Sequence, residues 1–280
     1  MTNSTHSPVI TSRTLWLYFA LAFGITWGIL IPGLNLVPPP LDILVIIVAA
    51  FGPFAAAVVA MRTGQGREAT RTWLKSMFRL RIPGYLYLAG AFLLPIGVGV
   101  AHYGLYRLLG GRPALAEGIP WYQYLAYLIP TALLTGGNEE PGWRSFALPA
   151  LLERFHPVAA SAVLGVAHAF WHWPLMGRYE TDMGWYLLNV LPLTVLLNWC
   201  YLRSRGSVVP VMLFHAGVNV IGSFFPTPHD VLGGVGTYML LRSLVYWVGA
   251  AAVIAATKGR LGWQGGVDGA RVTDAVASDV

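Results

Sequence analysis

The sequence predicts an all-α, polytopic membrane protein with about eight transmembrane helices in a single bundle. Its 280 residues are 56% hydrophobic and only 11% charged, and the mean hydropathy is +0.59. Several apolar runs reach the roughly 20 residues that a helix needs to cross a hydrocarbon core of about 30 Å. These runs are continuous rather than alternating, which excludes a transmembrane β-barrel. A soluble domain would not carry so much apolar sequence.

The distribution of basic residues tests the number of spans. With a cytoplasmic amino terminus, fourteen of the 18 Lys and Arg residues fall on the inside. Arg107, Arg112 and Arg178 fall outside, and Arg242 lies within the last span. This positive-inside bias predicts cytoplasmic termini in an inner or plasma membrane, and it argues against a nucleic-acid partner. The predicted spans are 14–32, 41–61, 85–106, 121–137, 157–177, 184–202, 207–225 and 231–256.

The domain organisation follows from these spans. Residues 1–13 are expected to be a cytoplasmic segment without a removable signal peptide, and 14–256 to be the transmembrane domain. Residues 62–84 combine six basic residues with apolar ones and are expected to form an interfacial helix, with a plain cytoplasmic loop as the alternative. Residues 257–280 are polar and are expected to be a disordered cytoplasmic tail. Arg242 is expected to have a structural role with a buried partner.

Two adjacent glutamates, Glu139 and Glu140, stand where a membrane segment should be apolar. A charged side chain at that depth costs at least a few kcal/mol, which suggests a function. The fourth span is expected to break at 136–137, and a new helix from 142 to 155 would carry Arg144 at the cytoplasmic surface. Glu140 and Arg144 are spaced i, i+4 and can form an ion pair. Glu139 then lacks an obvious cationic partner, which suits a general base.

Four more polar residues, in two pairs, lie in apolar runs. His168 and His172 are one helical turn apart and could bind one metal ion, or they could be hydrogen-bonded core residues. His215 and Asn219 also share one face and could stabilise an oxyanion, or they could form an interhelical hydrogen bond.

Together these groups supply a carboxylate, imidazoles and an amide, the parts needed to activate water and hydrolyse an amide bond. The single cysteine, Cys200, has no basic neighbour in these motifs, so water is the expected nucleophile. The predicted depths of these side chains in the membrane do not all agree. By these boundaries His172 lies past the midplane, so its helix must start later or tilt.

The motifs resemble those of the CAAX prenyl protease and bacteriocin-processing (Abi) family, which includes the Ras-converting endopeptidases. The resemblance covers roughly residues 120–225, with its core at 135–222. It is carried by Glu-Glu-x-x-x-Arg, by a tryptophan–histidine–x–proline sequence and by His-x-x-x-Asn. The residues that match are Glu139, Glu140 and Arg144, then Trp171, His172 and Pro174, then His215 and Asn219.

The resemblance implies a role for each group. Glu139 and His172 would activate water, His215 and Asn219 would form the oxyanion hole, and Glu140 and Arg144 would orient the site. The chain departs from the family pattern at two positions. Ser145 stands where glycine is common, and His168 stands where phenylalanine is common. His168 would be an extra metal ligand or a partner that tunes His172.

The expected function is an intramembrane endopeptidase that cuts a peptide or lipidated peptide near the cytoplasmic interface. The expected mechanism uses glutamate and no cofactor. Zinc held by Glu139, His172 and His215 is the alternative. A non-enzymatic immunity protein or peptide- or lipid-binding protein on the same fold remains a second reading. A proton-coupled transporter is a third, but no second broken helix supports it.

Overall fold

The protein is helical throughout the residues that the computed structural model describes: 10–78, 80, 82–111, 119–178, 182–225 and 235–265. This confirms the all-α prediction. The longer helices are α1 (Ser12–Leu36), α2 (Asp42–Ala50), α3 (Gly52–Met77), α5 (Leu94–Leu108), α6 (Tyr124–Leu134), α9 (Pro157–Trp171), α10 (Met183–Arg203), α11 (Val209–Val220) and α12 (Val235–Ala256). The short ones are α4 (Gly84–Leu88), α7 (Glu140–Gly142) and α8 (Leu148–Leu152).

The lengths of the helices fit a polytopic membrane protein. Five helical stretches in the described part of the chain are long and apolar enough to cross a bilayer. They are Ser12–Leu36, Asp42–Met77, Gly84–Leu108, Met183–Arg203 and Met239–Ala256. Two shorter apolar helices, Pro157–Trp171 and Val209–Ser223, correspond to further predicted spans. The number of eight crossings therefore stays a prediction.

The turns between helices gather at two ends of the bundle. At one end Arg154 donates to the carbonyl of Ile10, and the N–H of Val208 donates to the carbonyl of Met77. These residues belong to segments predicted to be cytoplasmic. They come from four separate parts of the chain, which the two hydrogen bonds join in two pairs.

The opposite end holds segments predicted to lie outside. Arg178, which follows α9, forms an ion pair with the buried Asp42 at the start of α2. The N–H of Ile119 donates to the carbonyl of Ser223. Helices that run alternately up and down place their turns in two such groups, as this chain does.

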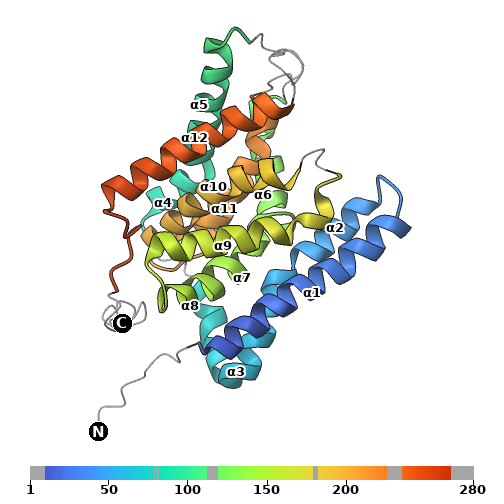
Figure 1. Ribbon diagram of the computed structural model, residues 1–280, viewed down its shortest axis with the longest axis vertical. Helices are drawn as coiled ribbons and strands as arrows, with labels where there is room; N and C mark the ends of the chain where they lie inside the picture. Colours follow the sequence, from blue (N-terminus) through green and yellow to red (C-terminus); the bar gives the residue numbers. More distant parts are fainter. Residues whose placement is uncertain are drawn as a thin grey trace.

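The centre of the molecule is built around a broken helix. In Figure 1, α9, α10, α11 and α6 lie in the middle, with α1, α2 and α3 on one side and α12 and α5 on another. Helix α6 stops at Leu134, and the chain resumes at Gly137 in the single turn η4 (Gly137–Glu139), followed directly by α7. Pro141 lies in the first turn of α7, where its missing N–H removes no helical bond. The predicted break is confirmed.

Close backbone contacts hold the broken segment in place. A Cβ added to Gly137 would lie 2.5 Å from the carbonyl oxygen of Ala132 and 2.8 Å from that of Met212. A Cβ added to Gly142 would lie 2.4 Å from the carbonyl oxygen of Pro53. Only glycine allows the backbone to approach α3, α6 and α11 this closely.

Three expectations need correction. Arg144 is fully buried rather than at the cytoplasmic surface, because it lies in the π-helical segment η5 (Trp143–Ala147), whose five residues are all buried. The new helix ends at Leu152, three residues early. The tail is not disordered from its first residue, since Leu261 is buried in the core. Residues 266–280 lie outside the described residues.

The basic segment 62–84 is partly as predicted. Its first part, up to Met77, is helical, but it continues from the preceding span within α3. Gly66 has a φ of +84°, and this non-helical residue separates the two halves. Arg67, Arg71 and Lys75 are exposed on one face of the second half. Its contact with a membrane surface stays a prediction.

Gly142→Ala is expected to destabilise the fold, because the backbone fixes the position of the new Cβ and the Pro53 carbonyl is itself a backbone group, so neither can rotate away. Overpacking of this kind costs about 1–3 kcal/mol. The measurement is the melting temperature of the purified protein in detergent. Gly24→Ala in α1 is the matched control, since a Cβ there meets nothing within 4 Å. Equal melting temperatures for the two variants would contradict the close packing at Gly142.

Candidate active site

The helix break places both glutamates inside the protein. Glu139 ends η4, and Glu140 begins α7. Their side chains are buried, with relative exposures of 4% and 0%. The preceding turn is held by Asn138, whose Oδ1 accepts a hydrogen bond from the N–H of Gly136 at 2.9 Å. Successive residues of the break therefore direct two carboxylates into the bundle in different directions.

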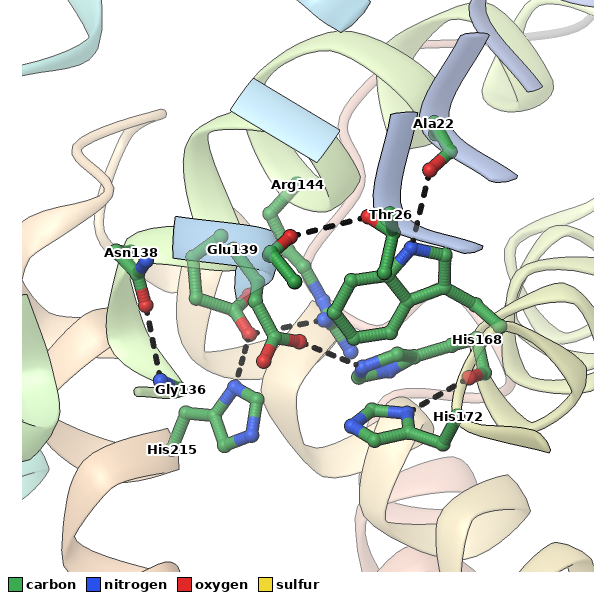
Figure 2. Close-up of polar contacts among 12 residues, drawn as sticks. Ala22, Thr26, Gly136, Asn138, Glu139, Arg144, His168, His172 and His215 are labelled. Atoms are coloured by element: carbon green, nitrogen blue, oxygen red, sulfur yellow. Dashed lines mark hydrogen bonds and ion pairs between the residues drawn. The ribbon is translucent and has the colours of Figure 1, made fainter. Parts of the chain in front are cut away.

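Glu140 is the centre of a buried polar chain. Its Oε1 accepts from Arg144 Nη1 at 2.9 Å, as the spacing predicted, and from His215 Nδ1 at 2.5 Å (Figure 2). Arg144 Nε donates to Asn198 Oδ1 at 3.2 Å, and Asn198 Nδ2 donates to Ser161 Oγ at 2.9 Å. The chain thus links α7, α9, α10 and α11. Buried ions are tolerable only with such partners.

Glu139 meets a different histidine from the one expected. Its Oε2 lies 3.0 Å from Nε2 of His168, and the two share a hydrogen bond (Figure 2). His172 instead donates through Nδ1 to the carbonyl of His168 at 3.0 Å. His172 follows the last residue of α9, one turn beyond His168. The direct partner of Glu139 is therefore His168, although His172 lines the same cavity.

Asn219 lies on the other side of this cavity, one turn after His215 on α11. Unlike the other polar groups it is exposed, and it is among the residues that line the cavity. A Cβ added to Gly136 would come within 2.6 Å of its Nδ2 and 3.7 Å of the His215 ring. The absence of a side chain at Gly136 therefore leaves room for both groups beside the broken helix.

These groups surround a cavity of about 410 Å³, a volume within the usual range for small-ligand sites. Glu139, His168, His172, His215 and Asn219 all line it. The structure therefore brings together the expected carboxylate, imidazoles and amide. Glu140 and Arg144 stand behind the wall, where they contact His215 and Asn198.

Tyr186 and Asn189 of α10 line the cavity, although neither was predicted from the sequence as a site residue. Arg242 of α12 also lines it. Arg242 was expected to have a buried partner, and its Nε donates to Asn189 Oδ1 at 3.3 Å. A polar residue in an apolar run was the available signal for Asn189, as it was for the histidines.

One group of described residues could hold a metal ion. Ligand atoms of Glu139, His168 and His172 lie within 4.8 Å of one another. One carboxylate and two imidazoles, with a position left for water, are a donor set that catalytic zinc uses. His215, which the zinc alternative included, is not part of this group, and its Nδ1 contacts Glu140. The residues fit zinc, but with His168 in place of His215.

The fold and the site define a polytopic helical membrane protein with a buried carboxylate–histidine centre. The family model of the type II CAAX prenyl endopeptidase Rce1-like proteins matches residues 120–221. The match contains both glutamates, the histidines and Asn219.

CAAX prenyl protease 2 of Methanococcus maripaludis is also similar to this chain. The two are 22% identical over 256 residues, which cover 85% of this chain and 92% of the relative. The resemblance to the CAAX prenyl protease family is confirmed, and residues 120–221 are the part of the chain that matches the Rce1-like family model. These matches support a peptidase that works within a membrane.

Arg144→Met should destabilise the protein by about 3–5 kcal/mol, because it leaves the Glu140 carboxylate buried without its cation. Adding Glu140→Gln removes that charge, so the double variant is expected to be more stable than Arg144→Met alone. Thermal unfolding in detergent measures both. Arg62→Met, at an exposed arginine of α3, is the control. A double variant that is as unstable as the sum of the single variants would contradict the coupling.

Proposed function

We propose that this protein is an intramembrane endopeptidase in which Glu139 and His168 activate a water molecule. The observation that carries the proposal is the hydrogen bond between Glu139 Oε2 and His168 Nε2 on the wall of a cavity that His215 and Asn219 also line. A carboxylate bonded to an imidazole can accept a proton from water and pass it on. This assignment replaces His172 by His168 as the partner of the catalytic glutamate.

The water attacks the carbonyl carbon of the scissile peptide bond. Glu139 takes the proton of the water, and the new C–O bond converts the carbonyl into a tetrahedral oxyanion. When the C–N bond breaks, the Glu139–His168 pair returns a proton to the leaving amine. The products are a carboxylic acid and an amine, and the pair regains its first state.

His215 and Asn219 are proposed to bind the oxyanion. The Asn219 amide supplies N–H donors at the cavity surface. The Nδ1–H of His215 donates a hydrogen bond to Glu140. Nε2 can therefore donate to the oxyanion only if the ring is doubly protonated. Glu140 and Arg144 would orient the His215 ring, because Arg144 fixes the Glu140 carboxylate that accepts the hydrogen bond from the ring. Loss of one such donor costs about 10²–10³ in kcat for known oxyanion holes.

The mechanism is proposed to need no metal. The proposal is supported by the Glu139–His168 pair, which can by itself accept the proton of a water molecule and return it to the leaving amine. In the alternative, Glu139, His168 and His172 would hold zinc, which would lower the pKa of a bound water and polarise the carbonyl.

The proposed substrate is a peptide or a lipidated peptide, such as a prenylated CAAX tail, that enters from the cytoplasmic side of an inner or plasma membrane. The name of the Methanococcus relative supports the CAAX class. Both termini are proposed to be cytoplasmic. The excess of Lys and Arg in the predicted inside segments supports this orientation, and the Arg154–Ile10 hydrogen bond joins two of these segments.

Glu139→Gln and His168→Ala are each expected to reduce cleavage by about 10²–10⁴, the usual contribution of general acid–base catalysis. His172→Ala is the matched control one turn away, and it should retain most of the activity. The assay follows cleavage of a farnesylated CAAX peptide and of a mixed membrane-peptide library by purified protein. Size-exclusion chromatography verifies that each variant is folded.

The opposite result, in which His172→Ala is inactive and His168→Ala is active, would overturn the assignment of His168. Folded wild-type protein that cuts no peptide would favour a binding or immunity protein on the same fold.

Removal of metal with a chelator is expected to leave cleavage unchanged, because Glu139 and His168 act directly on water. Mass spectrometry of metals in the purified protein provides a readout that does not depend on activity. If the chelator abolishes cleavage and zinc restores it, the proposal of a metal-free mechanism is wrong.

A further inference from the structure

The second half of α3, residues 67–77, lies at the level where two membrane helices begin. A Cβ added to Gly64, shortly before this half, would lie 2.6 Å from Oγ1 of Thr14 in the first turn of α1. At the other end, the carbonyl of Met77 accepts a hydrogen bond from the N–H of Val208, which directly precedes α11. Figure 1 shows α3 beside the start of α1. Because both ends of the segment meet helix starts on the predicted inside, the segment runs along the membrane surface instead of across the bilayer.

One face of this segment packs on the protein. Ala69, Trp73 and Leu74 are partly buried against the core. Trp73 Nε1 donates to the carbonyl of Ser145 in η5 at 3.0 Å. Ser145 directly follows Arg144, the cation of the buried ion pair. The segment therefore covers the part of η5 that carries Arg144.

The opposite face carries three cations. Arg67, Arg71 and Lys75 are exposed and follow one another at intervals of four residues, so they form a row about 12 Å long. Within the part of the chain that the structure describes, no ion pair joins any of them to an acidic residue. Glu68 is the one acidic residue among residues 67–77. Like charges one turn apart repel each other, and a bound anion relieves that repulsion.

The residues beside this row favour a lipid headgroup over a soluble anion. Phe78 and Leu80 follow the segment and are 42% and 69% exposed. Apolar side chains next to a row of Arg and Lys are typical of helices that lie in the headgroup region of a membrane. An anionic phospholipid offers a phosphate to the cations and an apolar phase to Phe78 and Leu80 at the same place. A soluble polyanion offers only the first.

We propose that Arg67, Arg71 and Lys75 bind the headgroups of anionic phospholipids in the predicted cytoplasmic leaflet. The sequence pattern predicted a helix near the membrane surface, and the structure adds which face is free and which side chains it presents. Because the same segment contacts Ser145 through Trp73, bound lipid should stabilise the fold around η5 by mass action. The inference does not depend on the proposed hydrolysis.

The alternative role for this face is a row of solvated cations that only adds to the positive charge of the inside segments. That role predicts a lipid preference that any three basic residues at this end could supply. A headgroup site on α3 predicts a preference that depends on its own three cations, and the experiment is designed around this difference.

The test measures binding of phosphatidylglycerol and phosphatidylcholine with matched acyl chains to the purified protein in detergent, by native mass spectrometry. Wild-type protein should prefer phosphatidylglycerol by about 10- to 100-fold, since each basic residue near anionic headgroups contributes roughly fivefold in affinity. The triple variant Arg67→Gln, Arg71→Gln and Lys75→Gln should lose this preference, and Arg71→Gln alone should lower it about fivefold. Salt at about 1 M should also remove it, because the Debye length is then only about 3 Å.

The matched control changes three other exposed cations of predicted inside segments, Arg13, Lys258 and Arg260, to Gln. This control should keep the preference for phosphatidylglycerol. The melting temperature in detergent is the second readout, and phosphatidylglycerol should raise it more than phosphatidylcholine does in the wild type and the control but not in the α3 variant.

A preference that survives the triple change on α3, or that the control loses to the same extent, would overturn the inference. Wild-type protein that cuts no peptide but binds phosphatidylglycerol through these cations would overturn the proposed function and support the inference.

Discussion

The buried ion pair between Glu140 and Arg144 is the constraint on which the site depends. Both side chains are fully buried, so each would be prohibitively expensive without the other. The pair closes one turn of the broken helix and extends through His215 on one side and Asn198 on the other. It therefore fixes the position of α11 and α10 relative to the break. Glu139, the preceding residue, contacts His168 of α9 and lines the cavity.

A broken helix is the feature that makes this arrangement possible. A continuous helix from α6 would place Glu139 and Glu140 about 100° apart on its surface with their backbone groups fully paired. The break at Gly136 and Gly137 brings the backbone against α6 and α11, at distances that no side chain permits. Irregular backbone at membrane depth is tolerated where it is buried in protein or lines a cavity, and both conditions hold here. The glycines thus allow the helix break, and the break places the two carboxylates inside the protein.

Much of this could be predicted from the sequence, because the decisive signals were local. Apolar runs located the helices, the i, i+4 spacing gave the Glu140–Arg144 pair, and two glycines marked the break. The choice between His168 and His172 could not be made locally, since both lie on one face of the same helix. The placement of α9 against η4 shows that His168 is the hydrogen-bond partner of Glu139 and that His172 lines the same cavity. The burial of Arg144 was missed for a related reason. Its partner Asn198 is a neutral residue of α10, and neither charge nor spacing along the chain connects it with Arg144.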